Sequence, residues 1–183
     1  MSNIGIRLCL NRNTAMNVLK RTPLLLVSFV FFALYGPALT AEAGELAIDE
    51  FKLQVRSVVD GLSSTEFWLP GSTLRVKVDN TNPLAFGMPE NVLATFLGEN
   101  DAYQIVPSAY NDRVERIVTF IDRDILQSGW LIGEDVISKK AAMVSVDRGE
   151  GKIILIGFRA QHRMQTHGTF KLVFNALVSG PED

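Results

Sequence analysis

The sequence predicts a mixed α/β domain that follows an N-terminal export signal. Apolar and polar residues alternate over residues 73–79, which predicts a strand with one buried and one solvated face. Two short apolar runs flank Arg148-Gly149-Glu150-Gly151, which predicts a β-hairpin with a four-residue loop. Apolar residues recur at helical spacing over residues 169–178, which predicts an amphipathic helix after the hairpin. The residues expected on its buried face are Phe170, Val173, Phe174 and Leu177.

Length, composition and charge narrow the number of domains and the class of partner that the chain can have. The chain has 183 residues, enough for one domain and a targeting segment. Its apolar content of 47% and charged content of 21% argue against wholesale disorder. The net charge of −2 is unevenly distributed, because residues 1–43 carry four basic residues and one acid, and the remainder has a net charge of −5. An acidic body without clustered Lys and Arg excludes a nucleic-acid partner.

Residues 1–43 have the pattern of a secretory signal peptide. Lys20-Arg21 precede an apolar run at 24–35, and Ala41-Glu42-Ala43 supplies a small-residue cleavage motif. A helix over that run is about 18 Å long, whereas the apolar layer of a bilayer is about 30 Å thick. We therefore expect cleavage before Gly44 and export to the periplasm or the extracellular space.

Two alternatives remain open for this segment. An uncleaved run at 24–35 would anchor the chain, and this is the only membrane contact that we expect. Met16 would begin a shorter signal peptide than Met1 and is an alternative start. In either case residues 44–183 form the folded domain. Because Cys9 is the only cysteine, that domain is expected to have no disulfide and no thiol nucleophile.

The rest of the chain predicts short elements. Residues 44–62 are expected to contain a short helix, and Pro89 is expected to begin another that runs to about Leu97. Because residues 153–156 are apolar on both faces, the strand that contains them is expected to be central in the sheet. The expected strands are 73–79, 102–107, 115–122, 141–147 and 152–158.

The connecting segments are rich in turn residues. Residues 63–72 are expected to form a loop around Pro70-Gly71, with Phe67 and Trp68 packed beneath its rim. Residues 125–132 are interpreted as connectors around Gly129-Trp130.

The loop after the last predicted strand is the main candidate for a functional site. It carries seven polar side chains, Arg159, Gln161, His162, Arg163, Gln165, Thr166 and His167. Guanidinium groups bind anions and carboxylates through paired hydrogen bonds, so one interpretation is an anion-binding loop. The alternative is that these side chains cap the ends of the strand and the helix, or dock against another domain.

Other chemistries find little support in the sequence. His162 and His167 are the only histidines, and no carboxylate lies in 154–178, so a metal site is not expected. No G-x-S-x-G elbow, P-loop or dinucleotide-binding string occurs. Asp122 and Asp124 are interpreted as solvated charges at a strand end rather than as catalytic acids.

Eight distinctive strings lie between residues 46 and 177. They are Glu66-Phe67, Pro70-Gly71-Ser72, Leu74-Arg75-Val76, Asn82-Pro83-Leu84-Ala85-Phe86-Gly87-Met88-Pro89, Gly129-Trp130-Leu131-Ile132-Gly133-Glu134, Gly157-Phe158-Arg159, Gln165-Thr166-His167-Gly168-Thr169-Phe170-Lys171 and Phe174-Asn175-Ala176-Leu177. Together they resemble the C-terminal tail of large exported bacterial zinc carboxypeptidases of the carboxypeptidase A-like family.

The resemblance implies a particular fold. In that family the zinc domain lies upstream, and the tail is similar to a class I glutamine amidotransferase domain. The chain would then be part of a flavodoxin-like, three-layer α/β sheet that ends in a β-hairpin and a helix and lacks the opening βαβ unit. Zinc is implied only for the catalytic domain that this chain does not contain, and no cofactor is expected here. Where amidotransferases have Phe-His-Pro-Glu, this chain has Phe158-Arg159-Ala160-Gln161.

The implied function is that of an exported, non-catalytic accessory domain that docks to another protein. One alternative is the truncated end of a complete zinc metallocarboxypeptidase. A second is a small-anion binding module. The expected partners are a peptidase domain or a second copy of the chain, which would pair through a sheet edge that truncation exposes.

Overall fold

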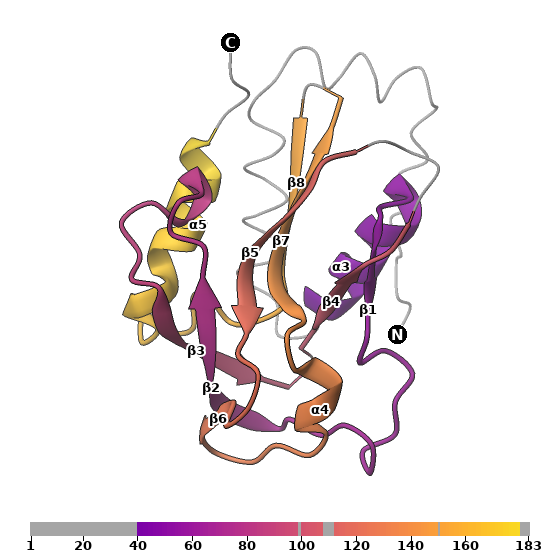
Figure 1. Ribbon diagram of the computed structural model, residues 1–183, viewed down its shortest axis with the longest axis vertical. Helices are drawn as coiled ribbons and strands as arrows, with labels where there is room; N and C mark the ends of the chain where they lie inside the picture. Colours follow the sequence, from indigo (N-terminus) through magenta and orange to yellow (C-terminus); the bar gives the residue numbers. More distant parts are fainter. Residues whose placement is uncertain (1–39, 99, 108–111, 150, 180–183) are drawn as a thin grey trace, which may run out of the picture. The chain divides into compact units, whose positions relative to one another are not determined.

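The computed structural model describes residues 40–179 except residues 99, 108–111 and 150 (Figure 1). These residues belong to one compact unit, Gly36–Asp183. The predicted apolar run at 24–35 and the alternative start at Met16 lie outside the described residues. Among the helices that are described, none combines the length and the apolar character needed to cross a bilayer.

In the part of the chain that the structure describes, eight strands form one sheet. They are β1 (Val55–Ser57), β2 (Gly71–Val78), β3 (Asn91–Leu97), β4 (Tyr103–Ile105), β5 (Val114–Phe120), β6 (Leu126–Ser128), β7 (Ala141–Arg148) and β8 (Gly151–Ile156). The strand order is β1-β4-β7-β5-β2-β3, with β6 beside β2 and β8 beside β7. Each pairing between these strands is antiparallel.

Strand β2 confirms the alternation predicted for residues 73–79. Ser72, Leu74, Val76 and Val78 are buried, and Lys77 is exposed. One edge of β2 pairs with β3 over its whole length, and the other edge pairs with β6 and then with β5. The apolar side chains of β2 and Ser72 therefore face the core, while Thr73, Arg75 and Lys77 lie on the other face and remain at least partly accessible to solvent.

Strand β7, like β2, pairs with three neighbouring strands. Its residues from Ala141 to Val146 are all buried. It pairs with β5 on one edge and with β8 and β4 on the other. The predicted hairpin is confirmed, but the ladder extends to Arg148 and Gly151, so its connection is shorter than the predicted four residues.

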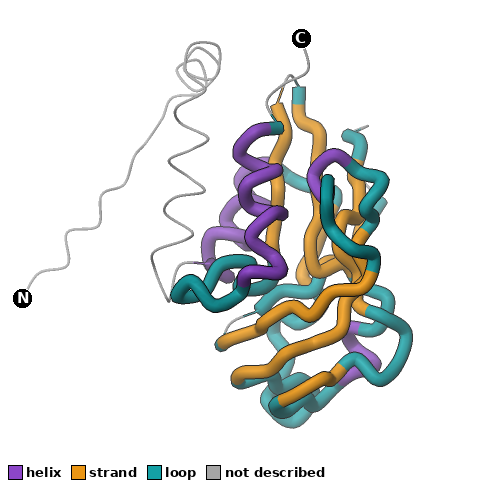
Figure 2. Tube along the Cα trace, turned by 90° about the vertical axis from the view of Figure 1, so that its left-hand side faces the viewer, coloured by secondary structure: helices purple, strands orange, loops and turns teal. Residues whose placement is uncertain are grey.

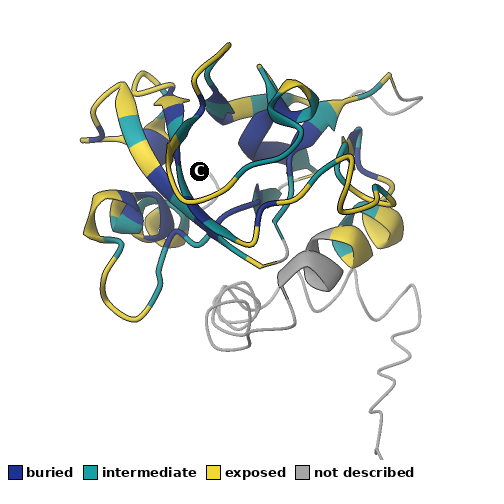
Figure 3. Ribbon diagram, turned by 90° about the horizontal axis from the view of Figure 1, so that it is seen from below, coloured by how far each residue is buried: buried dark blue, intermediate teal, exposed yellow. Residues whose placement is uncertain are grey.

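Within the described residues, three α-helices and two 3-10 turns accompany the sheet. They are α3 (Thr40–Phe51), α4 (Glu134–Ile137), α5 (Phe170–Val178), η1 (Pro83–Ala85) and η2 (His167–Thr169). Figures 2 and 3 place α3 and α5 on the same side of the sheet. On α5, the Nδ2 of Asn175 donates to the carbonyls of Leu84 and Phe86, which ties the helix to η1. The cleavage position expected before Gly44 falls inside α3.

The core contains a row of aromatic rings. Phe96 of β3 is fully buried, and its ring centroid lies 5.4 Å from that of Phe120 and 5.6 Å from that of Phe158. A second cluster joins β1, β4, β7 and β8 around Val55 and Tyr103. Side chains of α3 pack against this second cluster, and Ala47 and Ile48 are the residues involved.

The helix predicted from Pro89 to about Leu97 is wrong, because most of this segment is strand β3. Its residues pair one by one with β2, from Leu97 opposite Gly71 to Asn91 opposite Lys77. Ala94 and Phe96 face the core, which is strand periodicity. The neighbouring strand satisfies the backbone groups and overrides the helix start signal of the proline.

The central position predicted for residues 153–156 is also wrong. Of these four residues only Leu155 is buried, and β8 pairs with β7 alone among the described strands. The strand buried on both faces is β7, which lies between β5 and β8. Two consecutive apolar strands have similar composition, and only the pairing of the whole sheet decides which one is enclosed.

The buried face of α5 also differs in part from the prediction. Leu172 and Val173 are buried, whereas Phe174 is 60% and Leu177 is 40% exposed. Asn175 turns toward η1 to reach its carbonyls, and this contact sets the rotation of the helix.

The mixed α/β class is confirmed, with an open antiparallel sheet and few helices. A flavodoxin-like sheet is mostly parallel and has helices on both faces. The antiparallel pairing among the described strands differs from that arrangement.

Candidate functional site

The polar loop predicted as a site begins where β8 ends. The Gly157 amide donates to the Ala142 carbonyl at 2.9 Å, and the Arg159 amide donates to the Thr95 carbonyl at 2.9 Å. A Cβ on Gly157 would lie 2.2 Å from the Asp101 carbonyl oxygen, so this approach requires glycine. The chain thereby crosses from β7 to β3 before it enters the loop.

Two threonines close the loop from inside. The Thr166 Oγ1 donates to the Ala160 carbonyl at 3.0 Å and accepts from the His162 amide at 3.0 Å. The Thr169 Oγ1, which is buried, donates to the same carbonyl at 2.7 Å. These hydroxyls are used to hold the loop against the start of η2 and α5.

The tip of the loop is a tight turn with unusual backbone geometry. The Gln165 amide donates to the His162 carbonyl at 2.8 Å, which closes a four-residue turn. The central residues Arg163 and Met164 both have positive φ, at 46° and 59°. Positive φ at two successive residues other than glycine costs about 1–3 kcal/mol each. We call this tip, residues 162–165, the Arg163 turn.

The predicted site residues do not share one environment. Arg163, Gln165 and His167 are exposed, whereas Arg159, Gln161, His162 and Thr166 are partly buried. The His167 ring makes an edge contact with Phe170, with centroids 5.4 Å apart. The structure therefore uses Thr166 to close the loop and leaves Arg163 and His167 accessible at its outer side.

Within the part of the chain that is described, no three His, Cys, Asp or Glu side chains gather as a metal site would require. In the string Phe158-Arg159-Ala160-Gln161, Phe158 and Ala160 are buried, while Arg159 is partly buried and interacts with another group.

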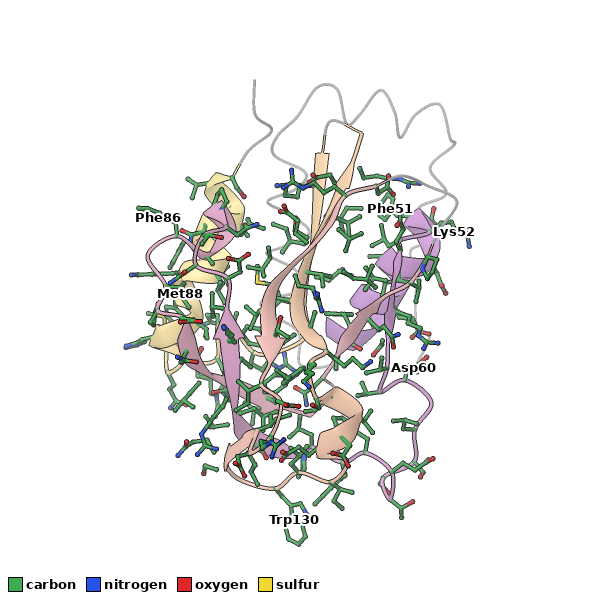
Figure 4. The ribbon with its side chains drawn as sticks, viewed as in Figure 1. Phe51, Lys52, Asp60, Phe86, Met88 and Trp130 are labelled. Carbon is green, nitrogen blue, oxygen red and sulfur yellow. The ribbon has the colours of Figure 1, made fainter. Side chains whose placement is uncertain are left out.

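A second candidate surface was not predicted as a site from the sequence. Trp68 is 39% and Trp130 is 61% exposed, and their rings meet edge to face with centroids 5.6 Å apart. The packing predicted for Trp68 beneath the loop rim is therefore wrong. In Figure 4 the Trp130 side chain projects away from the sheet at one end of the unit. The sequence signal is the Gly129-Trp130 pair, in a segment that has a second glycine at Gly133.

The backbone that carries Trp130 is held from several directions. The Ser72 Oγ accepts from the Trp130 amide at 2.8 Å and donates to its carbonyl at 2.7 Å. Trp68 and Ile132 form an antiparallel bridge with amide-to-carbonyl distances of 3.2 and 2.9 Å. Gly133 has φ of 81°, and a Cβ there would lie 2.2 Å from the Glu66 carbonyl oxygen. The exposed ring is thus attached to a backbone that hydrogen bonds hold in place.

Acidic residues accompany the two rings. Segments 63–70 and 129–137 contain Glu66, Glu134 and Asp135 and no Lys, Arg or His. The Ser63 hydroxyl and amide both donate to the Glu66 carboxylate, and these hydrogen bonds lower the pKa of Glu66. We call Trp68, Trp130 and these three acids the tryptophan surface.

The tryptophan surface suits a partner that offers apolar area and positive charge. Indole rings attract cations over their faces, and an acidic rim adds Coulomb attraction. Lys139, which follows α4, is paired with Asp122 at 2.9 Å. When the chain is compared with known proteins, no family model, no curated protein and no solved structure matches it.

Proposed function

We propose that the chain is an exported, non-catalytic docking domain whose contact is made through the tryptophan surface. The observation that supports this is the exposed Trp130, whose backbone amide and carbonyl are both hydrogen-bonded to the Ser72 hydroxyl. Ordering an interface side chain normally reduces affinity, and a ring on a rigid backbone avoids part of that loss. Tryptophan is also one of the residue types enriched among binding hot spots.

Export is proposed from the sequence pattern at 1–43. The test is the intact mass and the N-terminal sequence of the product in the native cell envelope. A product that begins at Gly44 supports a short exported domain. A much larger product that contains these peptides supports the alternative, a tail of a zinc metallocarboxypeptidase, and a product that retains residues 24–35 supports a membrane anchor.

The relation to the amidotransferase-like tail of zinc carboxypeptidases is likewise a proposal. Its support is the set of strings between residues 46 and 177. A longer chain could supply further strands beside the antiparallel sheet, and an experimental structure of such a chain tests this. A parallel flavodoxin-like core in that structure would support the shared origin, and its absence would contradict it.

Docking is tested by photocrosslinking in the cell that makes the protein. A benzoylphenylalanine at position 130 is compared with one at position 86, where Phe86 is 78% exposed. We expect a discrete crosslinked product from position 130 and none from position 86. Failure to crosslink from position 130, with the labelled protein present and exported, would contradict a docking function for this surface.

A second candidate function is binding of a small anion. It is favoured by the exposure of Arg163 and His167 in a stretch, 154–178, that lacks any acid. Calorimetry with phosphate and with simple carboxylates tests it, and Arg163→Ala should abolish any heat of binding. No heat at millimolar ligand would remove this candidate.

A further inference from the structure

We infer that the tryptophan surface of one chain binds the Arg163 turn of a second copy, so that copies join head to tail. The inference rests on the proposed docking function and names its partner. Both surfaces belong to one chain, and each has what the other lacks.

The tryptophan surface and the segment that carries the Arg163 turn are complementary in charge. The tryptophan surface carries three acids and no basic residue in its two segments, while residues 154–178 carry Arg159, Arg163 and Lys171 and no acid. Among described side chains no hydrogen bond or ion pair joins Arg163 to another side chain, and the residue is exposed. A guanidinium over the Trp130 ring, with Glu134 nearby, would satisfy both surfaces.

The Arg163 turn also has residue types that are typical of an interface. Met164 is 67% exposed beside Arg163, and Arg, Met and Trp are the residue types enriched at interface cores. Methionine sulfur makes favourable contacts with aromatic ring edges, and the side chain adapts to irregular surfaces. Arg163 and Met164 are the two central residues of a closed turn, and both are exposed, so a partner can reach them.

The geometry also decides the kind of assembly. Because the two surfaces are different patches, the interface is heterologous, and repeated contacts build a ring or an open chain rather than a two-fold dimer. One copy without a working tryptophan surface and one without a working turn can still form a single contact.

The experiment follows from this property. Sedimentation velocity over a range of concentrations is measured on the purified chain, in the form in which the cell makes it, and on the variants Trp130→Ala and Arg163→Glu. We expect the wild type to form species larger than a dimer and each variant to associate at least about tenfold more weakly. An equimolar mixture of the two variants should form a dimer that does not grow further.

The mixture also controls for folding, because each variant must retain one working surface to form the dimer. Phe86→Ala and Arg116→Ala remove an exposed aromatic ring and an exposed guanidinium elsewhere, and should leave assembly unchanged. Raising the salt concentration should weaken the wild-type assembly, since its contact includes exposed charges.

A wild type that stays monomeric up to ~1 mM would overturn the inference. Assembly that survives both substitutions would also overturn it and would indicate pairing through another surface, such as a sheet edge. These outcomes are separable from the docking proposal. If the residue-130 crosslink joins a different protein and the chain is monomeric, docking stands and self-association fails.

Discussion

The hydroxyl of Ser72 lies between the amide and the carbonyl of Trp130, accepting from one at 2.8 Å and donating to the other at 2.7 Å. Ser72 is buried and is the second residue of strand β2, 58 residues earlier in the chain. One side chain therefore satisfies both backbone groups of an exposed tryptophan. The consequence is that the orientation of the tryptophan surface depends on the sheet.

Ser72→Ala should remove both of these hydrogen bonds. We expect the free energy of unfolding to fall by about 1–3 kcal/mol, because polar backbone groups at a buried serine lose their partner. Both tryptophans of the chain lie at this surface, so intrinsic fluorescence during urea unfolding reports on it directly. The control is Ser138→Ala, which removes an exposed hydrogen bond to the Asp122 carbonyl and should cost less than about 1 kcal/mol. Equal losses for the two variants would contradict the assigned role of Ser72.

Gly133→Ala should be far more destabilising than Gly61→Ala. Both glycines have positive φ, 81° and 71°, so alanine pays a similar backbone cost of about 1–2 kcal/mol at each position. At Gly133 the new Cβ also meets the Glu66 carbonyl oxygen at 2.2 Å, whereas nothing lies within 4 Å at Gly61. The steric conflict should add a further ~1–3 kcal/mol, measured by chemical denaturation. A difference near zero would show that the two loops are not in contact.

Phe96→Ala tests the assignment of residues 91–97 as a strand. Phe96 is fully buried between two aromatic rings, so its loss should cost about 3–5 kcal/mol. Leu93→Ala should cost less than about 1 kcal/mol, because Leu93 is 50% exposed on the other face of β3. In a helix these two positions would share a face and cost similar amounts, so the contrast separates the two structures.

The wild type should lose stability at high pH, and the Tyr103→Phe variant should lack this loss. Burial, followed by the charge and the hydrogen bond of Asp101, raises the pKa of Tyr103 well above its usual value near 10. Stability from a raised pKa is fully present below the unfolded value and is lost as pH rises toward the folded value. Between these two values the wild type should lose about 1.4 kcal/mol per pH unit relative to Tyr103→Phe. Parallel stability curves from pH 9 to 12 would contradict this burial.

The local sequence predicted the elements whose pattern is independent of distant segments. The alternation in β2, the turn residues between β7 and β8, and the helical spacing of α5 each appear in the structure. These features depend on side-chain periodicity and on turn residues, and both can be read along the chain.

Pairing across the sheet decided what local pattern could not. Residues 91–97 became a strand because β2 offers a partner at each residue, and β7 rather than β8 became the enclosed strand because three neighbours pair with it. The rotation of α5 depends on carbonyls of η1 that lie about 90 residues earlier.

For the candidate sites, too, local sequence and tertiary structure each decided a different part. The sequence by itself placed the polar residues 159–167 after the last strand, because a run of polar residues between apolar elements predicts a loop. Only the tertiary structure brought Trp68 to Trp130 and Ser72 to the backbone between Gly129 and Leu131. Those contacts join segments that are about 60 residues apart, so their energy depends on the folded sheet and on no local preference.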